Sequence, residues 1–401
     1  MTKSAPIPQK FHAVFFSYGI LEQAGGFENY LMATTQGLAE RYSDLDVTIV
    51  TMTPRVVEKL QHILTIYFGR KQDPKAIYRE PYDVIMKKLK DVRYLRADSL
   101  KELAEILQTA DAIYSKNEVI EMTVLNKIGI KKLPPVMIGV HTPVYYPNTP
   151  SLSARLHNLI YTGFVYRRLT KHLKLIQVNN HDDLVLVKEK LKFGNVKVIG
   201  QAFDIPKLPK RSPHDGKLRL LFVGRLTEAK GITLLTNVIQ QLDTDFHDGY
   251  EMRIAGSGDT AFVNQIKKLA RNIDAVEYLG HVDNEKITEL YEWTDLTIIT
   301  SEYETLNKVA IETAIAGKVA ICTDIPGPRE VIVHNQTGYL LPANPALFTE
   351  KIQELAQLRR TNPDELLAIG TAAYKYVNKK FNAEEVYKEM YNDLLSIAKK
   401  G

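Results

Sequence analysis

Short apolar segments alternate with amphipathic segments along nearly all of the 401-residue chain, and this alternation limits the possible folds most strongly. Strand-like segments separated by helix-length segments are typical of parallel sheets with helices on both faces. The pattern therefore predicts an α/β protein of the doubly wound type. The expected strands are residues 13–17, 47–51, 112–115, 136–140, 175–178 and 196–199, then 218–223, 251–255, 276–278, 296–300 and 319–323.

A linker divides the two series of strands. Residues 204–216 contain three prolines and several charges, and they show no apolar periodicity, which is linker composition. A chain of this length also exceeds what one hydrophobic core usually serves. We therefore expect two Rossmann-like domains, residues 1–205 and 216–383, with a cleft between them and ligands beyond the carboxyl ends of the strands.

Composition excludes several protein classes. The chain is 45% hydrophobic and 25% charged, as in soluble globular proteins, which excludes a disordered or collagen-like chain. No apolar run approaches the roughly 18 residues of a membrane span. Cys322 is the only cysteine, so no intrachain disulfide can form, and we expect a reducing, cytoplasmic compartment.

Positive charge is concentrated in the first half of the chain. Residues 1–215 hold 31 lysines and arginines against 21 acidic residues, whereas residues 216–401 hold 21 against 26. One basic stretch spans residues 55–96, and the other spans residues 155–197. No module that reads or stacks bases is visible, which argues against nucleic acid as a partner.

The second basic stretch also shows helical periodicity. Leu156, Leu159, Ile160, Leu169 and Leu173 recur at helical spacing between the cations. A basic amphipathic helix of this kind can lie on an anionic membrane at the inner face. An ordinary surface helix that packs its leucines on the core explains the pattern equally well.

The second series opens with cations at the end of a strand. Arg225 follows the strand directly, and Lys230 with Gly231 opens the next helix. Two cations beside a helix N-terminus favour an anion, although surface cations flanking a turn would look the same. After the next strand, Gly256-Ser257-Gly258 either lets a flat ligand approach the backbone or forms a plain turn.

Two glutamates carry the strongest signal. Glu304 is expected in a loop after a strand, and Glu312, seven intervening residues later, about two turns into the next helix. Carboxylates repel a diphosphate, so we expect them to accept hydrogen bonds from sugar and ribose hydroxyls; two solvated glutamates are the alternative. The diphosphate would rest on N–H groups at the helix start, those of Thr305, Leu306, Asn307 and Lys308.

The order of these motifs resembles a known family. GRLTEAKG, AGSGD, YLGHV, the Glu304/Glu312 pair, Gly327 and NQTGYLL follow one another over residues 218–341, as in retaining GT-B glycosyltransferases, particularly glycosyltransferase family 4 (group 1). The resemblance implies two Rossmann-like domains facing a central cleft, an acceptor-side first domain and a nucleotide-sugar-binding second domain. It also implies that helix 384–401 crosses back to the first domain.

The resemblance implies roles for single residues. Arg225 and Lys230 would hold the donor diphosphate, Glu312 the ribose, and Glu304 the transferred sugar. The base would lie beside Val282 and the turn 256–258. In the first half, Gly25, Gly26 and His141 resemble positions that face the donor phosphate or sugar; a structural role is the alternative for His141. Relatives often carry Gly-Phe-Gly where this chain has Thr305-Leu306-Asn307; Asn307 can still adopt a positive φ, though less readily than glycine.

These inferences lead to one functional hypothesis. We expect metal-independent, retaining transfer from a nucleotide sugar, a UDP-sugar rather than GDP-mannose, to a glycan or lipid-linked acceptor. No cofactor is expected, because fixed cations and the helix start would replace a metal. The carboxylate triplets at 44–46 and 243–245 are interpreted as surface residues, before a strand and in a polar loop.

Other functions of the same fold remain open. A nucleotide-sugar-binding protein without turnover would lack part of the constellation, which is complete here. A phosphorylase would need a far longer chain with a lysine-bound pyridoxal group, and an epimerase would lack the paired glutamates.

Overall fold

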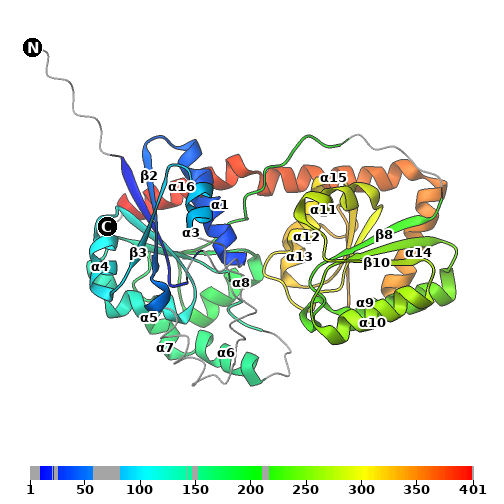
Figure 1. The fold of residues 1–401 in the computed structure, drawn as a ribbon, viewed down its shortest axis with the longest axis horizontal. Coiled ribbons are helices and arrows are strands. Elements are labelled where there is room, and N and C mark those ends of the chain that lie inside the picture. The colour runs from blue at the N-terminus through cyan, green and yellow to red at the C-terminus, as the bar shows by residue number, and fades with distance from the viewer. Residues whose placement is uncertain are drawn as a thin grey trace, which may run out of the picture. The chain divides into compact units, whose positions relative to one another are not determined.

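The structure is a computed structural model that describes residues 10–19, 21, 26–56, 82–141, 143–146, 152–209 and 216–399. It divides into two compact units (Figure 1). The first unit combines residues 1–202 with residues 383–401, and the second unit comprises residues 203–382. The boundary between Ala202 and Phe203 lies just before the proline-rich segment at 204–216.

The first unit is built on a seven-stranded parallel sheet of order β3-β2-β1-β4-β5-β6-β7. Its strands are β1 (Phe11–Ser17), β2 (Leu45–Met52), β3 (Val92–Ala97), β4 (Ala112–Lys116), β5 (Val136–Gly139), β6 (Leu175–Val178) and β7 (Val196–Val198). The chain moves outward in one direction from β1 and in the other from β4. The strand order therefore reverses between β1 and β4, which makes that position the topological switch point of the sheet.

Helices cover both faces of this sheet. They are α1 (Gly26–Arg41), α3 (Tyr82–Lys88), α4 (Leu100–Gln108), α5 (Val119–Lys127), η2 (Ile130–Lys132), α6 (Leu152–Thr162), α7 (Phe164–Thr170), α8 (His181–Leu186), η3 (Val187–Leu191) and α16 (Ala383–Lys399). In β1, Val14 and Phe16 belong to one apolar cluster, whereas Ala13 and Phe15 belong to another. Successive side chains point to opposite faces, so both faces of the sheet are core.

The last helix, α16, packs on the first unit beside α1 (Figure 1). A Cβ on Gly37 of α1 would lie only 2.3 Å from the ring of Tyr387, so the close approach of the two helices requires glycine there. Gln177 of β6 donates to the Asp393 carboxylate over 2.8 Å. The 383–399 segment thus forms part of the first unit although it is far away in sequence.

The second unit contains a six-stranded parallel sheet of order β10-β9-β8-β11-β12-β13. Its strands are β8 (Leu218–Val223), β9 (Tyr250–Ala255), β10 (Val276–Gly280), β11 (Leu296–Ile299), β12 (Val319–Thr323) and β13 (Tyr339–Leu341). Its helices are η4 (Glu228–Lys230), α9 (Ile232–Phe246), α10 (Thr260–Asn272), α11 (Asn284–Trp293), α12 (Lys308–Ile315), α13 (Pro326–Val331), α14 (Pro345–Thr361) and α15 (Pro363–Phe381). The switch point lies between β8 and β11. The doubly wound architecture predicted from the alternation is confirmed in both units.

Two strands were not predicted. β3 lies within the first basic stretch, where exposed Arg93 lies between buried Val92 and Tyr94. β13 has only three residues. Both are edge strands, and an edge strand is short or carries charge because its outer side is unpaired. Such strands lack the continuous apolar run that marks the central ones.

Two local predictions are wrong. The periodic leucines at 156–173 do not form one helix, because α6 ends at Thr162 and α7 begins at Phe164. A Cβ at Gly163 would lie 2.5 Å from the Leu159 carbonyl oxygen, so the chain bends there at a glycine. The triplet at 243–245 lies in the last turn of α9 rather than in a loop.

No helix of the described residues is long and apolar enough to cross a bilayer.

Candidate functional site

The cations and carboxylates singled out in the second unit meet at the switch point of its sheet. Arg225 and Lys230 follow β8, and Glu304 follows β11. β8 and β11 are neighbours in the sheet, and the strand order reverses between them. Carboxyl ends of parallel strands share one edge, and loops at a switch point diverge to leave space for a ligand. The topology therefore brings together residues that are about 80 positions apart in sequence.

Lys230 and Glu304 form an ion pair with each other. Their side chains are only 25% and 15% exposed, and Ser301 Oγ donates a further 3.0 Å hydrogen bond to Glu304 Oε1. The two residues had been assigned to different parts of a ligand, phosphate and sugar. The structure instead brings the Lys230 ammonium and the Glu304 carboxylate into contact. A ligand group that binds one of them therefore also lies close to the other.

The backbone fixes this pair in place. Thr300 Oγ1 donates to the Lys230 carbonyl oxygen over 2.9 Å, and Glu302 N–H donates to the Ala229 carbonyl oxygen over 3.0 Å. Gly231, at φ +63°, comes so close to Thr300 that a Cβ would lie 1.8 Å from its carbonyl oxygen. The turn after β8 is thus docked on the loop after β11. Helix α9 begins at Ile232, one residue later than predicted.

Arg225 is the remaining cation at this edge. It is exposed, and its guanidinium has no partner among the residues that the structure describes. Its backbone is held, since Leu226 N–H donates to the Ser257 carbonyl over 2.9 Å. An exposed guanidinium on a fixed backbone is suited to pairing with an anion.

Asn307 caps helix α12 and does not adopt a positive φ. Its φ is −96°, and its Oδ1 accepts a 2.8 Å hydrogen bond from Ala310 N–H. The positive φ that asparagine could adopt here is not used, because Asn307 acts as an N-cap rather than as a glycine substitute. Leu306 beside it is buried in the apolar cluster beneath the helix.

The first turn of α12 leaves donors available. Asn307 accepts hydrogen bonds from the N–H groups of Ala310 and Ile311. The N–H groups of Lys308 and Val309 have no acceptor among the described residues. Thr305, in contrast, makes interactions of its own. Of the predicted 305–308 segment, Lys308 is the residue whose N–H group stands at the helix start.

Glu312 lies little more than one turn into α12, not two, and it is held by a residue that sequence reasoning missed. Tyr291 of α11 donates a 2.7 Å hydrogen bond to Glu312 Oε2. Burial raises the pKa of Glu312, while the Tyr291 hydroxyl and then Lys308 lower it. Val282 packs in the same small apolar cluster as Tyr291. No sequence spacing links Tyr291 to Glu312, because the contact joins two different helices.

The glycines after β9 have a structural reason. Gly256, at φ +148°, would place a Cβ 1.8 Å from the Gly224 carbonyl oxygen, and Gly258 would place one 2.3 Å from that of Leu226. The turn 256–258 is therefore pressed against the segment that carries Arg225. Main-chain packing accounts for both glycines, and approach of a ligand to this turn stays a prediction.

In the first unit, His141 follows β5 at the carboxyl edge of the sheet. Its Nε2 lies 2.8 Å from the Tyr114 hydroxyl, and its ring centroid lies 4.3 Å from that of Tyr30 and 4.9 Å from that of Phe27. A Cβ on Gly139 would lie 1.9 Å from the Tyr114 hydroxyl oxygen. The histidine is thus oriented by an aromatic surround. Gly26 begins α1, and Gly25 lies outside the described residues.

A buried ion pair at this edge was also missed. Lys116, at the end of β4, lies 3.4 Å from Glu121, whose side chain is 2% exposed, and 4.9 Å from the Phe27 ring centroid. Burial raises the pKa of Glu121, and Lys116 opposes that rise. Tyr18 N–H, after β1, donates to Glu121 Oε1 over 3.1 Å. The pair thus marks the β1/β4 switch point, and the sequence signal was a lysine at the end of a predicted strand.

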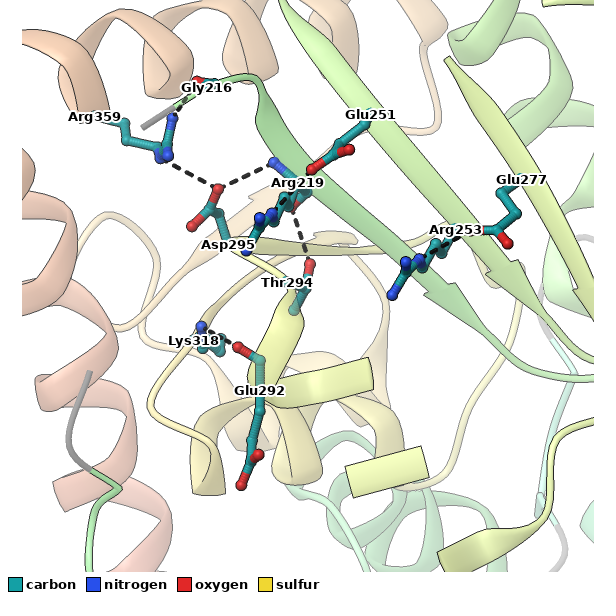
Figure 2. Close-up of polar contacts among 10 residues, drawn as sticks. All are labelled: Gly216, Arg219, Glu251, Arg253, Glu277, Glu292, Thr294, Asp295, Lys318 and Arg359. Atoms are coloured by element: carbon teal, nitrogen blue, oxygen red, sulfur yellow. Dashed lines mark hydrogen bonds and ion pairs between the residues drawn. The ribbon is translucent and has the colours of Figure 1, made fainter. Parts of the chain in front are cut away.

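At the amino ends of the strands of the second sheet, charged residues form hydrogen bonds and ion pairs that hold neighbouring elements together. Figure 2 shows Asp295 accepting from the Arg219 N–H over 3.0 Å and lying 3.2 Å from Arg359. Arg219 pairs with Glu251, and Arg253 with Glu277, across neighbouring strands. Asp295 precedes β11 and Arg219 is the second residue of β8, so this network lies toward the amino ends of the strands, away from Arg225 and Glu304.

No group of three or more His, Cys, Asp or Glu side chains is arranged to hold a metal ion within the described ranges. Asp44 and Asp46 of the first triplet have structural partners: Asp44 accepts from the Tyr391 hydroxyl over 2.7 Å, and Asp46 pairs with Arg93.

Residues 204–375 match a family model described as glycosyl transferases group 1. A glycogen synthase of Mycobacterium tuberculosis is 28% identical over 195 residues, which cover 44% of this chain and 47% of that protein. The chain spans about half the length of the curated relatives it matches. The residues that match the family model, 204–375, lie within the second unit, residues 203–382, where the motifs are dense.

Solved structures resemble the whole chain. A glycosyltransferase from Rickettsia africae superposes with a TM-score of 0.70 at 18% identity, covering 98% of this chain and 100% of that one. HepE of Anabaena, solved with UDP and glucose, gives a TM-score of 0.66 at 16% identity and covers 96% of this chain and 99% of its own. At such identities the likeness concerns the fold.

Proposed function

We propose that the chain is a glycosyltransferase that uses a nucleotide-diphosphate sugar, because residues 204–375 match the model of the group 1 glycosyl transferases and the chain has the GT-B fold. One observation carries the proposal: at the switch point of the second sheet, Arg225, Lys230 and the start of α12 stand beside Glu304, with Glu312 on the same helix. Cations for phosphate and carboxylates for hydroxyls meet at one edge.

The donor diphosphate is placed at the cationic side of this edge. Arg225 offers an exposed guanidinium, Lys230 an ammonium, and Lys308 a helix N-terminal N–H group. All three are fixed by their own backbone contacts, so little reorganisation is needed as charge develops on the leaving diphosphate. We assign leaving-group stabilisation to these groups, and we propose that transfer proceeds without a metal ion.

The nucleoside is placed toward Glu312. Tyr291 holds one carboxylate oxygen of Glu312, which leaves lone pairs for the ribose hydroxyls. Val282 and the turn 256–258 border the space proposed for the base. We propose a UDP-sugar rather than GDP-mannose as the donor. HepE, which has the same fold and was solved with UDP and glucose, supports this choice.

When the donor binds, the Lys230 ammonium is proposed either to leave Glu304 for the diphosphate or to contact both. A diphosphate brings more negative charge to Lys230 than one carboxylate does, so it competes for the ammonium. Glu304 is then free to accept hydrogen bonds from the transferred sugar. His141 is proposed to contact the sugar near its reacting carbon, and the anomeric configuration to be retained. The acceptor is proposed to be a glycan or a lipid-linked sugar.

A ligand panel tests the assignment. We expect UDP-sugars to raise the melting temperature more than GDP- or ADP-sugars, and the protein to release sugar slowly from the preferred donor in the absence of acceptor. Stabilisation without release under any condition would support a nucleotide-sugar-binding protein without turnover. No stabilisation by any nucleotide sugar would contradict the proposal.

Two further measurements address the mechanism. Activity that survives EDTA supports metal-independent transfer, and activity that is lost with EDTA and restored by Mg²⁺ contradicts it. NMR of the first-formed product reports its anomeric configuration, and an inverted product would contradict retention.

A further inference from the structure

A strongly basic depression lies at the amino edge of the first sheet, away from His141. Its lining comes from the segments that lead into β5, β6 and β7, together with α7. The amino ends of parallel strands share one edge, opposite the carboxyl edge. The depression, of ≈ 780 Å³, is therefore separate from the position of His141 in this unit.

The charge of the depression is unbalanced. Its cations are Lys131, Lys132, Arg167, Arg168, Lys171 and Lys192, and its lining contains no acidic residue. None of these six side chains has an ion-pair partner within the described part of the chain. His172 adds to the same wall, and its pKa is lowered, first by desolvation and then by Lys131 and Lys171. Six uncompensated cations around one depression create a positive potential that attracts a polyanion.

Exposed apolar side chains stand beside these cations. Phe164 lines the depression and is 71% exposed, and Val165 next to it is 66% exposed. On α6, which packs against α7, Leu159 is 71% and Leu152 is 82% exposed. Large apolar side chains grouped on one surface mark an interaction site. The two helices lie together at the lower side of the first unit in Figure 1.

The scaffold beneath this surface is firm. The Asn126 side chain donates to the Met122 carbonyl of its own helix and to the Leu169 carbonyl of α7, both over 2.8 Å. Ile130 and Leu191 form a buried floor. Of the periodic apolar residues, Leu173 is core and Ile160 and Leu169 pack against the core, whereas Leu156 and Leu159 point outward. The surface is therefore presented by packed helices, not by a loose segment.

We propose that this surface, formed by α6, α7 and the basic depression, docks on an anionic phospholipid membrane. Lipid phosphates would occupy the depression, and Phe164, Val165 and Leu159 would enter the headgroup region. Apolar side chains flanked by Lys and Arg are the combination that interfacial helices use. A nucleic acid would require aromatic stacking platforms, and the exposed residues here are mostly aliphatic. The inference does not rest on the proposed transfer reaction.

Flotation of the full chain with vesicles tests the proposal. We expect binding to vesicles that contain phosphatidylglycerol and little binding to phosphatidylcholine alone. Each cation near a membrane surface is worth about 1 kcal/mol, so R167Q/R168Q should weaken partitioning roughly 30-fold. The matched control is K267Q/K268Q, which removes an exposed adjacent pair from α10 of the second unit.

A second variant separates charge from apolar insertion. F164S/V165S keeps every cation, and we expect it to weaken vesicle binding at least about tenfold. Inorganic pyrophosphate and a short RNA serve as soluble competitors. Equal loss in the α10 control, no dependence on lipid charge, or tight RNA binding that F164S/V165S leaves unchanged would overturn the proposal. The melting temperature of each variant is measured as well. Where it is unchanged, weaker vesicle binding is due to the altered surface and not to unfolding.

Discussion

Arg225 is an exposed cation of the candidate site, and its effect can be measured directly. If it stabilises the departing diphosphate, Arg225→Ala should lower kcat/KM by about 10²-fold or more, as removal of one transition-state donor does. The fold should be unaffected, because the side chain is exposed and makes no hydrogen bond or ion pair with the described residues. Steady-state kinetics with the preferred donor give the ratio, and a loss under about threefold would remove Arg225 from the mechanism.

Glu304 is predicted to have opposite effects on nucleotide binding and on turnover. Glu304→Gln removes a carboxylate that pairs with Lys230 and that would repel a diphosphate. The freed ammonium should bind UDP about fivefold more tightly, the scale of one partly exposed ion pair. Transfer should fall, because the sugar loses its acceptor group. Calorimetric titration with UDP checks the first effect; weaker UDP binding in the variant would contradict the shared role of Lys230.

Glu312 should make stability depend on pH in a definite direction. Burial raises its pKa in the folded protein, so the folded state holds the proton more tightly than the unfolded state. Its contribution to stability is then present at low pH and is lost as pH rises through the folded-state pKa. Glu312→Gln, which can still accept from Tyr291, should therefore stabilise the protein more at about pH 8 than at about pH 5.

Thermal unfolding at the two pH values measures this difference. The same variant should bind donor more weakly if Glu312 holds the ribose. Tyr291→Phe serves as the matched change on the partner, since it removes only the hydroxyl that lies 2.7 Å from Glu312. A stabilisation that is equal at both pH values would mean that the carboxyl group does not titrate differently on folding.

At the scale of elements, the start of α12 depends on its cap. Asn307 is 3% exposed and accepts from Ala310 N–H, so Asn307→Ala should destabilise the protein by about 1 kcal/mol. Asn307→Asp keeps the acceptor and adds favourable charge at the helix N-terminus, so it should retain most of the stability. Its negative charge should nevertheless weaken diphosphate binding. Urea unfolding compares the variants, and an Ala variant as stable as the parent would exclude the cap.

Elements also show where sequence patterns mislead. One apolar periodicity covers residues 156–173, yet Leu173 is 5% exposed and Leu159 is 71% exposed. The glycine at 163 ends α6, and the second helix starts in a new direction. A periodic pattern predicts that a face is apolar, but it does not say whether a neighbour covers that face.

At the scale of the whole molecule, the first unit is completed by the end of the chain. Leu394 of α16 is fully buried in the core of the first unit. Leu394→Ala should therefore cost about 2–5 kcal/mol of unfolding free energy. Lys388→Ala on the exposed side of the same helix is the control and should change stability by less than about 0.5 kcal/mol. Similar small effects for both would show that α16 is not core.

The sequence by itself determined most of the strands, the doubly wound class and the order of the chemical motifs. It placed Arg225 after β8 and Glu304 after β11, because strand periodicity and turn composition are local properties. It also indicated the basic surface, since charge composition needs no coordinates. Residues 204–375 match the family model that the motif order led us to expect, and solved structures share the expected fold.

Only the tertiary structure decided which groups meet. Lys230 pairs with Glu304 across 74 positions, and Tyr291 holds Glu312 from another helix. It also decided that Asn307 caps α12 and that Leu159 is exposed while Leu173 is core. Such contacts depend on strand order and on the packing of whole helices, whereas a sequence pattern records only the spacing of residues along one element.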